Sequence, residues 1–161
     1  MATKSLPKEF LEIIFRHAEK EYPKECCGLV LGPLGQSGYS RVRPCRNVYD
    51  ECHQKEPEHF PRTSRNAYFI DPSELLAVQK ELRLQKQEIK IIYHSHVDTG
   101  AYFSEEDKRA ALLNGESAYP GVDYGVVSVI AGKVAGAALY RCQKKEGQAA
   151  FTKKTISVGQ A

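Results

Sequence analysis

The sequence has no apolar run that approaches the roughly 20 residues needed to cross a membrane. It also has no internal repeat and no low-complexity segment. Residues 1–9, with the sequence MATKSLPKE, lack the apolar core of a signal peptide. We therefore expect a cytoplasmic protein that does not associate with a membrane.

Charge of one sign is also scarce, because the net charge is only +3. The basic residues are dispersed and form no stripe with interleaved aromatic residues, so a nucleic-acid partner is not expected. The five cysteines are an odd number, and Cys26 and Cys27 are adjacent. In a reducing compartment this pattern predicts free thiols rather than a disulfide framework.

A chain of 161 residues is long enough for one domain with a substantial core. Apolar residues at helical spacing predict a first helix over residues 7–21, which Pro23 ends. Residues 28–32 predict a short buried strand, and residues 39–48 predict a second strand that pairs with it as a hairpin. The polar stretch 47–65 has no clear period and predicts a long loop.

The second half of the chain alternates helices and strands. After a short strand at 68–70, Asp71 as N-cap and Pro72 at the first helical position predict a helix that fades near Gln87. A strand is predicted from Ile89, and a helix is predicted from Ser104 that Asn114-Gly115 stops. Two strands at 124–130 and 134–141, joined by a turn, follow. An edge strand at 151–158 and a mobile tail at 159–161 complete the predicted order. This order predicts a mixed α/β fold, in which helices pack on the faces of a mixed β-sheet.

Residues 91–96 (IIYHSH) end an apolar strand in two histidines. Because residues i and i+2 of a strand point to the same face, His94 and His96 present their imidazoles side by side. Ser104 begins a helix-like segment, and Asp107, one turn in, can turn its carboxylate back toward the histidines. Two imidazoles and a carboxylate suit zinc, and three protein ligands leave the fourth position to water, as in catalytic zinc sites.

Each fragment of this pattern has a simpler interpretation when it is taken alone. Two histidines on a strand face are more often ordinary polar residues, and Ser104 with Asp107 is a plausible helix cap that needs no metal. The full string, in which seven residues separate His94-x-His96 from Ser104-x-x-Asp107, is far more specific than either fragment.

This string resembles the JAMM motif of the MPN (Mov34/PAD-1) metallopeptidases. The family pattern adds a glutamate just before the first strand, and Glu25 matches it. Val97 and Phe103 stand where the family often has proline, but neither supplies a ligand. The resemblance covers residues 7–142 and implies one domain over 1–161 with the MPN (JAB) fold. That fold is a curved mixed β-sheet with flanking helices, related in architecture to cytidine deaminases.

The resemblance also implies a zinc metallopeptidase with one Zn²⁺ per chain, held by His94, His96 and Asp107. In that family role Glu25 takes a proton from the attacking water and passes it to the leaving amine, while the Ser104 hydroxyl donates a hydrogen bond to the oxyanion. The simpler alternatives are a solvated acid for Glu25 and a helix cap for Ser104. Ser104 can serve both as a helix cap and as the oxyanion donor.

The implied substrate and partner is a ubiquitin-like or sulfur-carrier protein, whose amide or isopeptide bond is hydrolysed after a C-terminal Gly-Gly. Only glycine lets an extended backbone pass through a narrow slot beside the metal. The alternatives are a catalytically inactive MPN scaffold that binds partner proteins, and another zinc hydrolase such as a deaminase. The intact motif argues against the scaffold, and the sequence lacks the Cys-x-x-Cys ligand pair expected of a deaminase.

The predicted loop at 47–65 contains Cys52, His53 and His59, and Cys45 stands just before it. A second zinc site there is an open alternative, but the spacing matches no defined pattern, so ordinary polar loop residues are the favoured interpretation. Long loops in compact domains often carry function, and we expect this one to guide the Gly-Gly tail of the substrate.

Overall fold

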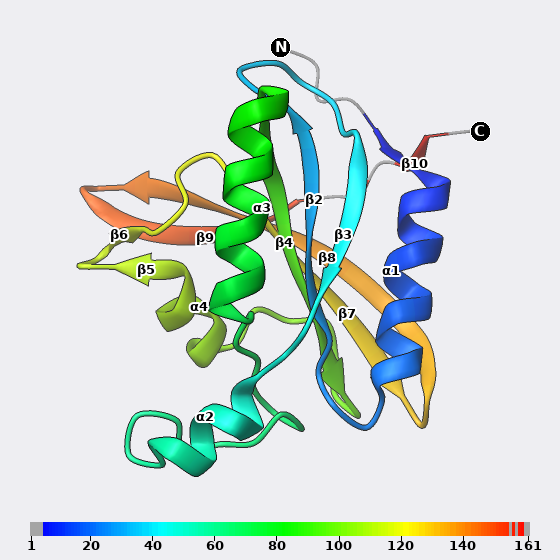
Figure 1. The fold of residues 1–161 in the computed structure, drawn as a ribbon, viewed down its shortest axis with the longest axis vertical. Helices are drawn as coiled ribbons and strands as arrows, with labels where there is room; N and C mark the ends of the chain where they lie inside the picture. The colour runs from blue at the N-terminus through cyan, green and yellow to red at the C-terminus, as the bar shows by residue number, and fades with distance from the viewer. Residues whose placement is uncertain (1–4, 155, 157, 160–161) are drawn as a thin grey trace.

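The computed structural model describes residues 5–154, 156 and 158–159. Its main feature is a six-stranded sheet in the order β3-β2-β4-β7-β8-β9 (Figure 1). The strands are β2 (Cys27–Pro33), β3 (Arg41–Cys45), β4 (Gln87–Val97), β7 (Asp123–Ile130), β8 (Lys133–Lys145) and β9 (Gln148–Lys154). Neighbouring strands are antiparallel except β4 and β7, which run parallel, so the predicted mixed sheet is confirmed.

Two long helices cover opposite faces of this sheet. The side chains of β4 alternate, so Ile91 and Tyr93 join the apolar cluster that contains Ile14 of α1 (Lys8–Glu21). Ile92 instead joins the cluster that contains Val78 of α3 (Pro72–Gln85). Figure 1 shows α3 crossing in front of β2 and β4. The two histidines of β4 share the face of Ile92, so they point to the side of the sheet on which α3 packs.

The predicted helix and hairpin boundaries are confirmed where local chemistry determines them. The Asp71 carboxylate accepts a hydrogen bond from the backbone N–H of Ser73 at 3.0 Å, and Pro72 is the first residue of α3. Lys86 ends that helix in the left-handed conformation, with φ 53°. The turn between β7 and β8 places Ala131 and Gly132 at φ 49° and 84°, as a tight hairpin requires.

The predicted loop at 47–65 is partly wrong, because it contains the helix α2 (Tyr49–Lys55). Figure 1 shows α2 beyond the end of the sheet at which β4 finishes. The predicted strand at 68–70 is also wrong, since only an isolated bridge joins Ile70 to Asn47. The Tyr68 ring stacks on His94 of β4, and its backbone pairs with no strand in the described part of the chain. Strand propensity cannot predict such a tertiary contact.

Two predictions near the ends of elements need correction. The helix α4 (Glu105–Ala111) stops before Asn114-Gly115, which instead turns the short hairpin of β5 (Leu112–Leu113) and β6 (Glu116–Ser117). The last strand of the sheet, β9, begins earlier than predicted and pairs with β8. Of the predicted mobile tail, Gly159 belongs to β10 (Val158–Gly159), which pairs with β1 (Leu6–Pro7), while residues 160–161 lie outside the described residues.

No helix in the described part of the chain is both long and apolar enough to span a membrane.

Candidate metal centre

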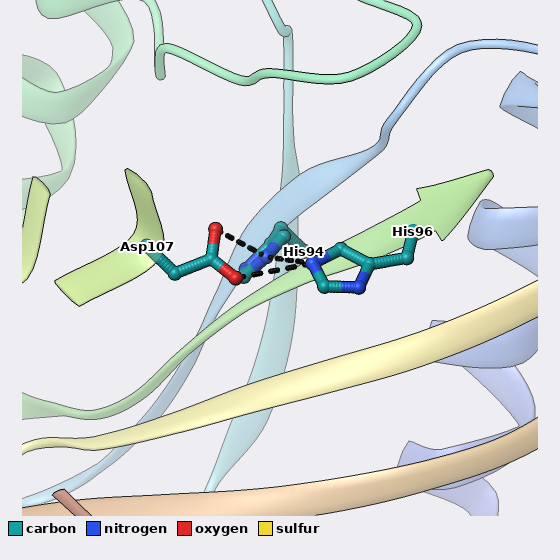
Figure 2. Close-up of side chains that lie close together, drawn as sticks. All are labelled: His94, His96 and Asp107. Atoms are coloured by element: carbon teal, nitrogen blue, oxygen red, sulfur yellow. Dashed lines mark hydrogen bonds and ion pairs between the residues drawn. The ribbon is translucent and has the colours of Figure 1, made fainter. Parts of the chain in front are cut away.

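His94 and His96 lie near the end of β4, one of the two central strands of the sheet. β2 pairs with β4 on one side and β7 pairs with it on the other, so the backbone that carries both histidines is fixed from two directions. Both residues are buried, with 0% and 5% of their surface exposed. Their Nε2 atoms are 3.3 Å apart (Figure 2).

Asp107 reaches the two histidines from the first turn of α4. Its Oδ1 lies 3.1 Å from His94 Nε2, and its Oδ2 lies 3.0 Å from His96 Nε2 (Figure 2). The capping box that begins α4 orients this carboxylate. Ser104 Oγ accepts a hydrogen bond from the Asp107 N–H, and the Ser104 N–H donates to Asp107 Oδ2, both at 3.0 Å. The predicted cap and the predicted ligand position are therefore compatible.

The protonation states of this cluster suit a metal. Burial lowers the pKa of His94, so its imidazole is neutral at pH 7. Burial alone would raise the pKa of Asp107, but its hydrogen bonds with His94 and His96 hold that pKa well below the usual range. The carboxylate is therefore ionised and accepts rather than donates.

The contact of His96 Nδ1 with a backbone carbonyl group determines which ring nitrogen carries the proton. His96 Nδ1 lies 2.8 Å from the carbonyl oxygen of Gly100, which can only accept, so Nδ1 carries the proton. Nε2, which contacts Asp107 Oδ2 in this structure, is then the nitrogen that would bind a metal in place of that contact, as in many histidine ligands whose second nitrogen bonds to a carbonyl group. The ligand atoms of His94, His96 and Asp107 all lie within 4.8 Å of one another. Two nitrogens and a carboxylate oxygen fit zinc and leave one tetrahedral position open.

Aromatic rings flank the two histidines. The Tyr68 ring stacks on His94 with the ring centroids 4.4 Å apart, and Tyr102 meets His96 edge-on at 5.0 Å. Within the described part of the chain, the buried Nδ1 of His94 has no hydrogen-bond partner, so this ring is held by the contact of its Nε2 with Asp107 and by stacking on Tyr68. Sequence reasoning did not assign Tyr68 to the site, because its contact with His94 depends on the tertiary fold.

Glu25 lies between α1 and β2 and is 6% exposed. Burial raises its pKa to about 9, the charge of Asp107 adds to this rise, and Arg62 opposes it. The next residue, Cys26, is hydrogen-bonded to Ser95, which stands between the two histidines. The backbone of Glu25 therefore lies beside the strand that carries the predicted ligands. A buried carboxyl group with a raised pKa is typical of groups that transfer protons.

The fold brings together the three predicted metal ligands, with Ser104 at the cap beside them. The roles of these residues and of Glu25 in catalysis stay predictions. A second metal site around Cys45, Cys52, His53 and His59 gains no support: over residues 5–154, 156 and 158–159, the only cluster of three or more potential metal ligands is His94, His96 and Asp107. His53 Nδ1 instead contacts the carbonyl oxygen of Phe60 at 2.6 Å.

A mixed sheet with two histidines on a central strand and a carboxylate on the following helix defines an α/β protein with a candidate zinc centre. The chain belongs to the family of prokaryotic homologs of the JAB domain, whose model matches residues 7–144. The resemblance found in the motif is thereby confirmed, and with it the MPN/JAB fold.

Among curated relatives, the chain is 28% identical over 103 residues to the CysO-cysteine peptidase of Mycobacterium tuberculosis, covering 64% of this chain and 62% of that protein. The same values hold for the Mycobacterium bovis protein. It is also 33% identical over 98 residues to the tail tip assembly protein K of Escherichia phage N15, covering 61% of this chain and 32% of that protein. The chain thus spans less than two thirds of the length of these relatives.

Two solved structures share the fold over nearly the whole chain. Protein DSY2949 from Desulfitobacterium hafniense has a TM-score of 0.69 at 24% identity and covers 98% of this chain and 93% of its own. A protein from Salinibacter ruber has a TM-score of 0.60 at 20% identity, with 98% and 92% covered. At these identities the likeness extends to the fold alone.

Proposed function

We propose that this protein is a zinc metallopeptidase that acts as a single domain over residues 1–161 in the cytoplasm. It hydrolyses the amide bond that follows the C-terminal Gly-Gly of a ubiquitin-like sulfur-carrier protein. The observation that carries this proposal is the convergence of His94, His96 and Asp107 in a JAB-family chain, with a buried glutamate whose pKa responds to the charge of Asp107. The name of the mycobacterial relatives, CysO-cysteine peptidase, supports a peptidase with such a substrate.

The three ligands would hold zinc, which supplies Lewis-acid chemistry that activates water at neutral pH. Glu25 accepts the proton that the attacking water loses and then gives it to the nitrogen of the leaving amine. Its pKa is about 9 without a metal, and the positive charge of a bound zinc would lower that pKa toward neutral pH, which suits a group that first accepts and then donates a proton. In the ionised form Glu25 acts as base, and in the protonated form it acts as acid.

The hydroxyl of Ser104 is available as a hydrogen-bond donor. Its oxygen accepts the N–H of Asp107, which leaves the O–H of the same group free to donate. We assign that O–H to the carbonyl oxygen of the scissile bond, where negative charge develops as the carbonyl carbon is attacked. Ser104 therefore has two compatible roles, as the cap of α4 and as the oxyanion donor.

The test is a cleavage assay on a sulfur-carrier protein extended by one amino acid beyond its Gly-Gly end. The zinc-loaded wild type is expected to release that amino acid, which mass spectrometry detects. Glu25→Gln keeps the shape of the side chain but cannot accept a proton, so it should bind zinc and lose at least about 10²-fold in kcat. A zinc-loaded wild type that binds the carrier without cleaving it would show an inactive scaffold and refute the proposal.

A further inference from the structure

Glu25 stands in a short connection whose position the sheet does not determine. α1 ends at Glu21 and β2 begins at Cys27, so the backbone groups of Glu25 are outside both elements. A cavity of about 290 Å³ borders residues 24–26, so packing does not hold this stretch from that side. Buried backbone groups still need hydrogen-bond partners, and here those partners decide where Glu25 lies.

One partner belongs to the strand that carries the histidines. Ser95 is fully buried, its Oγ accepts the Cys26 N–H at 2.7 Å, and its own N–H donates to the Cys26 carbonyl at 3.1 Å. Because Ser95 lies between His94 and His96, this pair of hydrogen bonds ties the backbone that follows Glu25 to the candidate metal ligands.

The backbone groups of Glu25 itself are held by residues 47–65. The Glu25 N–H donates to the carbonyl of Ser64 at 2.7 Å, and the Glu25 carbonyl accepts from Nδ2 of Asn47 at 2.9 Å. The segment therefore has a contact with Glu25 that is separate from any contact it makes with a substrate.

The side chain of Asn47 is used to its full capacity. Nδ2 also donates to the Ala67 carbonyl at 3.1 Å, and Oδ1 accepts the N–H groups of Tyr49 and Phe69, both at 3.0 Å. A primary amide provides two donors and an acceptor in this geometry, whereas aspartate has the same shape and no donor. Asn47 thus joins the start of α2, the segment before α3, and Glu25.

Asp50 holds the other end of this arrangement. Its carboxylate accepts the Ser64 N–H at 2.7 Å and the Ser64 hydroxyl at 2.6 Å. These two bonds lower the pKa of Asp50, so the carboxylate stays ionised. The side chain is 44% exposed, so it can be replaced without opening the core. Asp50 fixes Ser64, and the carbonyl of Ser64 fixes Glu25.

We propose that Asn47 and Asp50 are positioning residues for Glu25: Asn47 holds its carbonyl group, and Asp50, through Ser64, holds its N–H. This inference rests on the proposed function, because it assumes that Glu25 transfers the proton. Misplacing a catalytic group by about 1 Å can cost about 10²-fold in rate. Loss of one of two anchors is therefore expected to lower kcat by about tenfold.

The principal variant is Asp50→Ala, and the matched control is Glu51→Ala. Glu51 is the next residue of α2, its side chain is 59% exposed, and it pairs with Arg46. In Asp50→Ala, kcat on the carrier substrate should fall about tenfold while KM and zinc content stay unchanged. Asp50→Asn keeps one acceptor oxygen and should recover most of the rate. Asn47→Asp, which loses both donors and keeps the volume, should repeat the loss.

A double-mutant cycle separates positioning from a general structural effect. If Asp50 acts only through Glu25, adding Asp50→Ala to Glu25→Gln should lower the residual kcat by less than twofold. Independent losses that multiply, an unchanged kcat in Asp50→Ala, or an equal loss in Glu51→Ala would each overturn the proposal.

A second readout does not require catalysis. Hydrogen exchange of the Glu25 amide, measured in the zinc-loaded protein, should be faster in Asp50→Ala and unchanged in Glu51→Ala. Unchanged protection of that amide in Asp50→Ala overturns the anchoring of Glu25, whatever the activity. If the wild type cleaves no carrier substrate, the proposed function fails, and this exchange measurement still decides whether Asp50 positions Glu25.

Discussion

At the scale of single residues, the candidate site contains two buried carboxyl groups, Asp107 and Glu25, that differ in protonation state. Asp107 stays ionised because two histidines face it, whereas Glu25, which lacks such partners, keeps a proton far above its usual pKa. Both are carboxyl groups in buried positions, and their different surroundings give them different protonation states. Two measurable consequences follow, one for metal content and one for stability.

The purified protein is expected to hold about one zinc per chain, and His96→Ala should abolish tight binding because it removes one of three ligands. His59→Ala is the matched control, since His59 is exposed and belongs to no cluster of potential ligands in the described part of the chain. Metal analysis after dialysis measures the difference. Full occupancy in His96→Ala would show that the three residues are not the ligands.

The metal-free protein is expected to lose stability as the pH rises from about 4.5 to 9. The pKa of Glu25 is about 9 in the folded protein and near its usual value of 4.5 in the unfolded chain, so the unfolded chain releases this proton at lower pH. Glu25→Gln removes the effect and should raise the free energy of unfolding at pH 8 by about 1–3 kcal/mol.

Urea unfolding of both proteins at pH 5 and pH 8, in the presence of a chelator, measures this effect. The difference between wild type and Glu25→Gln should be near zero at pH 5 and large at pH 8. Glu105→Gln, whose side chain is 79% exposed, is the control. A gap between wild type and Glu25→Gln that does not change with pH would mean that Glu25 is ionised in the folded protein.

At the scale of elements, the sequence predicts those parts whose local chemistry agrees with the fold. The Asp71-Pro72 start of α3, the turn at Ala131-Gly132 and the apolar β4 needed no tertiary information. The short polar helix α2 escaped prediction because seven residues make a marginal helix without tertiary support. The anchoring of Glu25 could not be predicted either, because it consists of hydrogen bonds formed in the tertiary fold, and Asn47 and Asp50 look like ordinary turn residues in the sequence.

Ser104 is expected to matter both to α4 and to the reaction. Ser104→Ala removes the N-cap, at a cost of about 1 kcal/mol in unfolding free energy, and removes the hydroxyl donor, at a cost of roughly 10²-fold in kcat. Ser104→Thr keeps both groups and should retain most of the rate and stability. Thermal unfolding and steady-state kinetics measure the two effects. An unchanged kcat in Ser104→Ala would restrict this residue to the cap.

The predicted effect of shortening residues 47–65 changes now that this segment is known to contact Glu25. If residues 47–65 only guided the tail, shortening them would impair cleavage of a folded carrier more than cleavage of a short Gly-Gly peptide. A deletion that removes Asn47 or Ser64 should instead slow both substrates, because it removes a hydrogen-bond partner of Glu25. A cleaner test of tail guidance replaces the exposed His59 and Glu58 by alanine and compares kcat/KM for the two substrates. Equal values for wild type and variant would exclude these side chains from recognition.

At the scale of the whole molecule, the five cysteines fall into two groups that differ in burial. Cys26, Cys27 and Cys45 are buried around β2, with 1%, 0% and 7% of their surface exposed. Burial raises the pKa of Cys26 and of Cys45 to about 12, and it raises that of Cys27 further. Thiols with such values are unreactive at neutral pH.

The folded protein is therefore expected to react with a thiol reagent at no more than Cys52 and Cys142, which are partly exposed. All five cysteines should react after unfolding in urea, since each lies in the described part of the chain as a free thiol. Cys142→Ser should lower the count for the folded protein by one. Rapid reaction of a third thiol in the folded protein would show that β2 opens at neutral pH.

The pairing of β4 also determines when, during folding, the site can form. His94 lies opposite Cys27 on one side and Val126 on the other, so its neighbours come from distant parts of the chain. Contacts between residues so far apart in sequence form slowly, because long loops must close first. Glu25 and the two histidines come together only after β2 has paired with β4. A chain that is still being synthesised can therefore assemble the site only after β4 has been made. An incomplete chain without β4 lacks both histidine ligands.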